Sequence, residues 1–231
     1  MRVVDDALRG AQAVAVSWHG VLFDRDRRAI HAAIRETFLE WSVDVRDDEL
    51  SLMRGPTGRA QLERMLTIPR IAEEFRAHHA HWASALDIDA MTRSLEPRLL
   101  RAAECFNEPN ADAVAAIHRL HALGIKTAAI CCSPRRLLGP QLESLRRAHV
   151  ELDVIITADE ACEPAPAPWG IFEVMQQLGL EDPDALALID DCPAGAAAAR
   201  HAGARAIALE VAGEPASSDV LATVRSLSEI A

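Results

Sequence analysis

Short apolar runs alternate with helical stretches along most of the second half of the chain. The runs show no regular polar alternation, which is typical of strands buried on both faces of a parallel sheet. Segments with apolar residues three and four positions apart lie between them, which is typical of amphipathic helices. A similar apolar run lies near the start of the chain. The predicted strands are 13–16, 127–131, 154–157, 185–189 and 205–209, and the helices between the later strands are about 135–147, 169–178 and 194–202.

This order of elements predicts an α/β fold with a Rossmann-like, doubly wound parallel sheet and helices on both faces. Asn110 is placed to cap a helix that Gly124 ends. A last helix is predicted at about 217–230.

The segment between the first two strands has a different pattern, because its apolar residues keep a helical spacing throughout. Ile30, Ala33, Ile34, Phe38 and Trp41 form one such stripe. Further helices are predicted at about 60–66, 71–86 and 88–101, after a turn at 53–58. The chain is therefore expected to have a core domain at 1–24 and 106–231, and an inserted all-helical cap domain at 25–105.

The first strand runs into a tight turn at Ser17-Trp18-His19-Gly20. In parallel α/β sheets, ligands and catalytic groups collect just beyond the carboxyl ends of the strands. Ser17 and His19 are therefore the candidate catalytic residues. A serine hydrolase in which Asp190 or Asp191 orients His19 is one interpretation. A direct hydrogen bond between Ser17 and His19 requires this turn to bend sharply.

Other reactive side chains also follow predicted strands, namely Cys131, Cys132, Cys162, Asp191 and Cys192. Their loops are expected to converge with that of His19 at one edge of the sheet. Thiolate and imidazole are preferred ligands of Zn²⁺, so His19 with Cys131 and either Cys192 or Asp191 is a candidate soft-metal site. The other interpretation is that the cysteines act as small apolar residues.

Composition narrows the class of partner. The chain has 231 residues, of which 50% are hydrophobic, and a formal net charge of -11. Such a charge argues against nucleic acid or an anionic membrane as a partner, because both bind basic surfaces. No apolar stretch has the length of a signal peptide core or a membrane span, and the five cysteines do not form a disulfide framework pattern. We therefore expect a cytoplasmic protein with a small-molecule ligand.

The turn after the first strand resembles the first motif of the haloacid dehalogenase superfamily, and most closely that of its phosphonoacetaldehyde hydrolase (phosphonatase) branch. Trp18, Gly20 and Asp24 match that motif. The aspartate nucleophile of the family falls on Ser17, and the motif position two residues later is His19. The resemblance implies the core and cap fold predicted above.

The inserted segment is similar to the phosphonatase cap at Arg54, Pro56 and Gly58 and again at 69–72. The lysine that forms a Schiff base with the aldehyde substrate in phosphonatases falls on Gln61. Because a carboxamide cannot form an imine, that route to phosphonoacetaldehyde chemistry is absent. Phosphonatases commonly pair through their caps, so the resemblance implies a homodimer.

The resemblance extends through the second half. The phosphate-binding Thr or Ser falls on Cys131, the basic residue of a Pro-rich segment on Ala165, and the second acid of the fourth motif on Gly195. It implies a Mg²⁺ site at Asp191 with Asp190, although hard cations need several oxygen ligands and Ser17 brings no charge. The candidate substrate-binding positions are Gly20, Gln61, Cys131, Cys132 and Ala165.

These substitutions lead to two functional hypotheses. The first is a phosphonatase-like relative that has lost the nucleophile, the Schiff-base lysine and the phosphate-binding cation and now binds a small molecule without catalysis. The second is an active hydrolase of a small metabolite or phosphometabolite that uses Ser17, His19 and Asp191, or a soft metal, in their place. The first predicts that phosphoaspartyl chemistry is absent.

Overall fold

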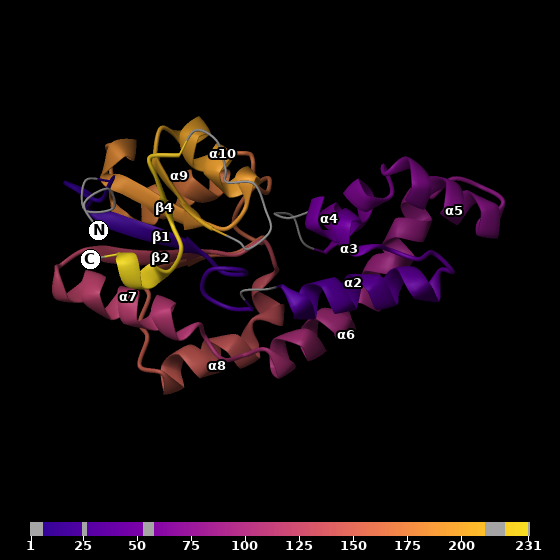
Figure 1. Cartoon of the computed structure of the whole chain (residues 1–231), viewed down its shortest axis with the longest axis horizontal. Helices are drawn as coiled ribbons and strands as arrows, with labels where there is room; N and C mark the ends of the chain where they lie inside the picture. Colours follow the sequence, from indigo (N-terminus) through magenta and orange to yellow (C-terminus); the bar gives the residue numbers. More distant parts are fainter. Residues whose placement is uncertain (1–6, 25–26, 53–57, 211–219, 231) are drawn as a thin grey trace.

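A computed structural model describes residues 7–24, 27–52, 58–210 and 220–230. Six parallel strands form one sheet in the order β3-β2-β1-β4-β5-β6 (Figure 1). The predicted α/β fold and its five strands are confirmed. The strands are β1 (Ala13–Ser17), β2 (Lys126–Ile130), β3 (Val154–Ile156), β4 (Leu186–Asp190), β5 (Arg205–Leu209) and β6 (Ala222–Val224).

Strand β1 lies at the centre of the sheet, between β2 and β4. Successive strands are added on one side of it as β2 and β3 and on the other as β4, β5 and β6. The strand order therefore reverses between β1 and β4, and in open α/β sheets such a point is where ligands bind. Ser17, the last residue of β1, lies at this point.

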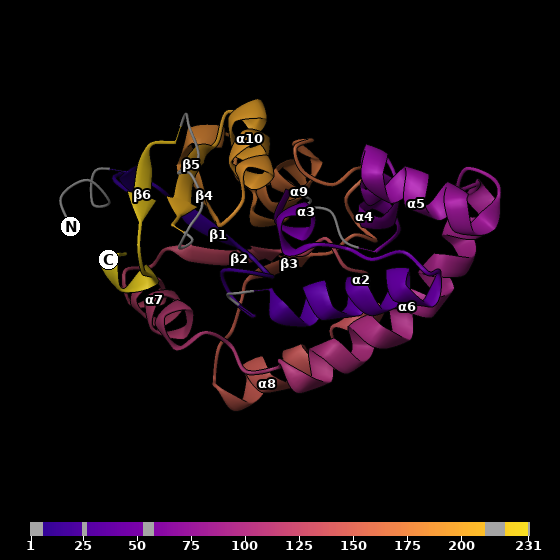
Figure 2. The same ribbon diagram turned by 45° about the vertical axis from the view of Figure 1, so that its right-hand side comes forward.

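Helices cover both faces of the sheet. In both views α7 (Ala111–Ala122) and α8 (Gly139–Arg147) lie on one face, and α9 (Trp169–Leu178) and α10 (Pro193–Ala202) on the other (Figures 1 and 2). Alternate residues of each strand pack against opposite helix layers. Val14 and Val16 belong to the hydrophobic cluster on the α7 side, whereas Ala13 and Ala15 belong to the cluster on the α9 side.

Of the described helices between β1 and β2 in the sequence, the five that precede α7 form the inserted all-helical part of the fold. They pack beyond the carboxyl ends of the central strands (Figure 1). Phe38, Leu62, Phe75 and Leu95 are fully buried in a separate hydrophobic cluster within this part. The helices are α2 (Arg28–Glu40), α3 (Asp47–Leu52), α4 (Arg59–Met65), α5 (Pro69–His79) and α6 (Ala85–Cys105).

Two helix boundaries in this part differ from the prediction. The sequence predicts a helix to residue 86, but α5 ends at His79, where Ala80 takes a left-handed conformation with φ 63°. Ser84 and Asp87 then form a capping box that starts α6, which runs for 21 residues. The apolar spacing continues across the break between α5 and α6, so spacing alone does not reveal that a new helix starts after Ser84.

The prediction of a terminal helix at 217–230 is wrong. Residues 222–224 form β6, which pairs in parallel with β5, and a 3₁₀ turn follows at Leu227–Glu229. Ala222 and Val224 are buried while Thr223 is exposed, so the period is that of a strand. Residues 217–219 lie outside the described residues. Asn110 does precede α7, but its side-chain amide donates to the Val21 carbonyl oxygen instead of capping the helix.

No helix within the described residues is both long enough and apolar enough to cross a membrane.

Candidate functional site

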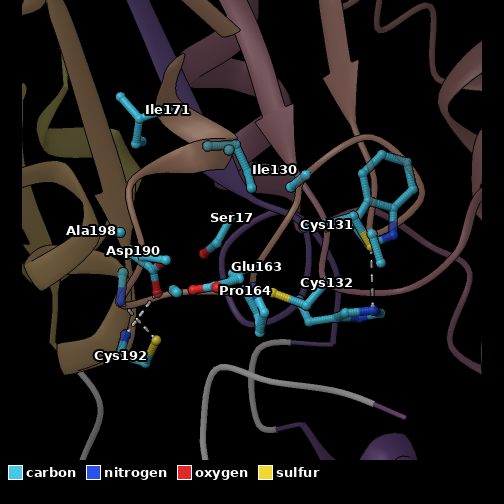
Figure 3. Close-up of a pocket in the computed structure, with 18 of the residues that line it drawn as sticks. Ser17, Ile130, Cys131, Cys132, Glu163, Pro164, Ile171, Asp190, Cys192 and Ala198 are labelled. Atoms are coloured by element: carbon cyan, nitrogen blue, oxygen red, sulfur yellow. Dashed lines mark hydrogen bonds between the residues drawn. The ribbon is translucent and has the colours of Figure 1, made fainter. Parts of the chain in front are cut away.

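A cavity of about 200 Å³ lies beyond the carboxyl ends of β1, β2 and β4, on the side covered by α9 and α10. Ser17 ends β1 and Asp190 ends β4. The two-residue period of the strands places both side chains on the same face of the sheet as Ala13 and Leu188. Both line the cavity (Figure 3). The prediction that these strand ends converge is therefore consistent with the fold.

Ser17 is a buried hydroxyl on the cavity wall. Its residue is 8% exposed, and its Oγ has no hydrogen-bond partner in the described part of the chain. A buried hydroxyl without a partner carries a desolvation cost that a ligand can relieve. The Ser17 Oγ is therefore a group through which this cavity can bind a polar atom of a ligand.

The turn after β1 is held by backbone hydrogen bonds and by a glycine. The amide of Phe23 donates to the Trp18 carbonyl oxygen at 2.8 Å, and that of Gly20 donates to the Phe23 carbonyl oxygen at 2.7 Å. Gly20 has φ +90°, and a Cβ on it would lie 2.1 Å from Oδ2 of Asp191. Gly20 is not among the residues that line the cavity. Because Gly20 has no side chain, it leaves room for the Asp191 carboxylate.

Asp191 is paired with Arg27, a residue that the sequence did not single out. The Arg27 Nε donates to Asp191 Oδ2 at 2.9 Å, and Nη2 donates to Oδ1 at 2.5 Å. The same Nη2 donates to the carbonyl oxygen of His19 at 2.9 Å. The side chains of Arg27 and Asp191 are 6% and 0% exposed. Burial disfavours the charge on Arg27, but the neighbouring Asp191 carboxylate outweighs it and raises the pKa of the guanidinium.

His19 contacts side chains at and just beyond the end of β2. Its Nε2 lies 3.3 Å from Ser133 Oγ and 3.8 Å from Cys131 Sγ. Burial of the ring, aided by the positive charge of Arg27, lowers the pKa of His19 to about 3, so the ring is neutral near pH 7. Among the described residues, no hydrogen bond links His19 to Ser17 or to a carboxylate. Ser17, His19 and Asp191 therefore do not form a hydrogen-bonded triad in this structure.

Asp190 is a buried acidic side chain that lines the same cavity as Ser17. Burial, together with the negative charge of Asp191, raises the pKa of Asp190 to about 7. Its Oδ1 accepts the backbone N–H of Cys192 at 2.9 Å. A Cβ on Gly195 would lie 1.9 Å from its Oδ2, so Asp190 fills the space that a side chain at residue 195 would enter.

Cysteines surround the same cavity, which Cys131, Cys132, Cys162 and Cys192 help to line. Burial raises the pKa of the Cys131 and Cys192 thiols above the ordinary range, and that of Cys132 to about 11. These three thiols are therefore protonated near neutral pH. In the described part of the chain, Asp190, Asp191 and Cys192 bring one ligand atom each within 4.8 Å of one another. His19 and Cys131 do not belong to that group.

The two remaining candidate positions lie differently. Ala165 lines the cavity, in a loop that also brings Pro164 and Glu163 to it (Figure 3). Gln61 on α4 is 3% exposed and does not line it, although its neighbour Ala60 does. Trp18 packs on Phe23, with ring centroids 4.9 Å apart, and donates to Gln141, as expected for a core residue.

The haloacid dehalogenase-like hydrolase family matches this chain over residues 2–203. The chain belongs to that family. It is 27% identical over 206 residues to a phosphonoacetaldehyde hydrolase of Nitratidesulfovibrio vulgaris, covering 87% of this chain and 71% of the relative. For a phosphonoacetaldehyde hydrolase of Bordetella pertussis, the identity is 23% over 208 residues, covering 89% and 74%.

A solved structure has the same fold as this chain. The crystal structure of a phosphonoacetaldehyde hydrolase-like protein from Oleispira antarctica superimposes with a TM-score of 0.83 at 19% identity. The match covers 87% of this chain and 72% of that one. The chain is thus a haloacid dehalogenase-like hydrolase family member with phosphonatase-like relatives, as the resemblance implied.

Haloacid dehalogenase-like hydrolases generally use Mg²⁺, and the residues present do not fit that ion. Mg²⁺ prefers six oxygen ligands at about 2.0–2.1 Å in near-octahedral geometry. Both carboxylate oxygens of Asp191 already accept hydrogen bonds from Arg27. Ser17 brings no charge, and the third member of the acidic group is the protonated thiol of Cys192.

Proposed function

We propose that this chain is a repurposed phosphonatase-like protein that binds a small molecule and has lost phosphoaspartyl chemistry. The observation that carries the proposal is Ser17, a buried hydroxyl at the position where the family resemblance puts the attacking aspartate. A hydroxyl attacks only when a neighbouring base activates it. Among the described residues, the Ser17 Oγ has no hydrogen bond to such a base.

No lysine lies among the described residues of the cavity wall, and the arginine there, Arg27, is paired with Asp191. Gln61 stands at the Schiff-base position and Ala165 at that of the phosphate-binding cation. Lys126 is the only lysine in the sequence. It is the first residue of β2, whereas the cavity lies beyond the carboxyl ends of the strands. Its Nζ donates to the Leu178 carbonyl oxygen at 3.1 Å. Its amine cannot reach a substrate beside Ser17.

The cavity lining favours an uncharged ligand. Most of the described lining residues are apolar or small, including Ile130, Ile171, Leu188 and several alanines. Arg27 is the one arginine or lysine among them, and its charge is balanced by the buried Asp191. A phosphate dianion would therefore enter an apolar site without a counter-ion, at a large desolvation cost. A neutral molecule with one polar group facing Ser17 Oγ would pay no such penalty.

Binding experiments test the ligand class. We expect a panel of small alcohols, aldehydes and amides to include compounds that raise the melting temperature, whereas inorganic phosphate and phosphonoacetaldehyde leave it unchanged. Ser17→Ala should weaken binding of the active compounds, and Ser228→Ala, at an exposed serine far from the cavity in sequence, should not. Stabilisation by phosphate that Ser17→Ala removes would refute the proposal.

The second hypothesis is a hydrolase with replacement groups, and one observation favours it. Asp190 shares the cavity with Ser17, and its pKa of about 7 is suited to a general base. In that mechanism Asp190 would replace His19 as the base. Ester hydrolysis that both Ser17→Ala and Asp190→Asn abolish, and that His19→Gln leaves intact, would establish it.

We also propose that residues 25–105 act as a cap over a core formed by 1–24 and 106–231, and that the protein is a cytoplasmic homodimer. The separate hydrophobic cluster of the inserted helices supports the cap, and the dimer rests on the resemblance to phosphonatases alone. Light scattering after size-exclusion chromatography tests the dimer, and fractionation of the source cells tests the location. A monomer at all concentrations would refute the dimer.

A further inference from the structure

We infer that Arg27 supplies, from within the chain, the positive charge that a divalent metal supplies in haloacid dehalogenase-like hydrolases, so that this site is built without a metal. Arg27 contacts the acid that the family resemblance assigns to the metal, Asp191, through two hydrogen bonds. It also contacts the His19 carbonyl oxygen in the turn after β1. One guanidinium thus joins the two loops that follow β1 and β4.

The contacts with Arg27 disfavour an ion at Asp191. A planar guanidinium matches the two oxygens of a carboxylate, and here each oxygen accepts an N–H of Arg27. An ion bound to either oxygen would have to displace Arg27 or lie beside its charge. Because the pair is almost completely buried, the repulsion between two cations would be only weakly screened.

Charge balance gives the same result. Asp190 and Asp191 are adjacent and buried, and together they could carry two negative charges. Arg27 adds one positive charge and lies in direct contact with Asp191. A divalent ion added to these three side chains would leave them with excess positive charge, even with both carboxyl groups ionised.

The backbone holds Arg27 in place at the start of α2. Arg27 has φ 53° and ψ 24°, a left-handed conformation that is uncommon for a residue with a side chain. Asp24 fixes this conformation, because its carboxylate accepts the N–H groups of Arg28 and Ala29, and its carbonyl oxygen accepts the N–H of Arg27. Such strain is retained where surrounding contacts maintain it. Asp24 is therefore a positioning residue for Arg27.

Metal binding by the purified full chain tests this assignment. We expect titration calorimetry with Mn²⁺ or Mg²⁺ to show no saturable binding to the wild-type protein, whose melting temperature neither ion changes. Arg27→Gln removes the charge and leaves Asp191 buried without a counter-ion. It should melt at a lower temperature, bind Mn²⁺ with one site per chain, and regain part of its stability when Mn²⁺ is added.

Two further variants separate charge replacement from a merely structural role. Arg27→Lys keeps the positive charge and should bind no Mn²⁺, whether or not it is less stable. The double variant Arg27→Gln/Asp191→Asn removes both charges and should also bind none. Saturable Mn²⁺ binding by the wild-type protein that Asp191→Asn abolishes would overturn the inference. So would an Arg27→Gln protein that neither binds Mn²⁺ nor is stabilised by it.

The result does not depend on whether the cavity binds or hydrolyses its ligand. Phosphate release by a wild-type protein that binds no metal would refute the proposed function and leave the role of Arg27 intact. Conversely, a wild-type protein that binds Mg²⁺ at Asp191 but releases no phosphate would refute the role of Arg27 alone.

Discussion

Gly195 lies directly against the carboxylate of Asp190, so that a Cβ on residue 195 would stand 1.9 Å from Asp190 Oδ2. The family resemblance puts the second acid of the fourth motif at 195, and this chain instead has its second acidic side chain at 190. The Asp190 carboxylate and a side chain at residue 195 would need the same space. The residue at one position therefore limits which residue fits at the other.

Gly195→Ala should destabilise the protein. Placing a methyl group against a buried carboxylate forces side-chain or backbone shifts that typically cost about 1–3 kcal/mol. Gly139→Ala is the matched control, because a Cβ there has no atom within 4 Å, and it should change stability by no more than about 0.5 kcal/mol. Urea denaturation measures both. If Asp190→Gly fails to rescue Gly195→Ala, the two residues are not coupled in the way described.

Gly20→Ala should be more harmful than an equivalent change at Gly10. Both glycines have positive φ, +90° and +79°, so alanine strains the backbone at either position by about 1–2 kcal/mol. Only at Gly20 would the new Cβ also strike Asp191, at 2.1 Å. The difference between the two melting temperatures isolates that contact. Equal losses would show that Asp191 does not require the glycine.

Asp190 should make the protein less stable as pH rises. Burial and the charge of Asp191 raise its pKa from 3.8 to about 7, so the folded chain holds a proton that the unfolded chain has released. The contribution of this raised pKa to the free energy of unfolding is therefore complete below about pH 3.8 and is lost as pH rises to about 7. Relative to the wild-type protein, Asp190→Asn should gain stability between pH 5 and 7, measured by urea denaturation at each pH. A constant difference across that range would contradict the raised pKa.

Four of the five cysteines should divide into two classes of reactivity in the native protein. Cys105 and Cys162 are exposed, whereas Cys131 and Cys192 are buried and the pKa of each buried thiol is raised. Since the thiolate is the reactive form, iodoacetamide near neutral pH should label the first two and spare the other two. Peptide mass spectrometry identifies the labelled sites, and denaturant should expose all five. Fast native labelling of Cys131 would contradict its protonated, buried state.

The sequence predicts the sheet well because its buried strands are continuous apolar runs, as at 185–189. It also predicts that groups at the strand ends gather at one edge of the sheet, where Ser17 and Asp190 line the same cavity. It fails at 217–230, where the alternation in β6 spans only three residues and is too short to stand out from a helical pattern.

Arg27 could not have been singled out from sequence. It stands among Arg25, Asp26 and Arg28, a run of charges that normally indicates a solvated surface. Its partner Asp191 lies 164 residues away. The left-handed backbone at Arg27 helps to bring the two together, and it has no local sequence signal.

Phosphate release by the Mg²⁺-supplemented wild-type protein is the most direct test of the central claim. The substrates are phosphonoacetaldehyde and a set of small phosphate esters, and the controls are Ser17→Ala and a purified phosphonatase assayed in parallel. The loss of the attacking carboxylate predicts no release above the Ser17→Ala background with any substrate. Turnover by the wild-type protein that Ser17→Ala abolishes would contradict it, and would show that a serine at the end of β1 carries the chemistry.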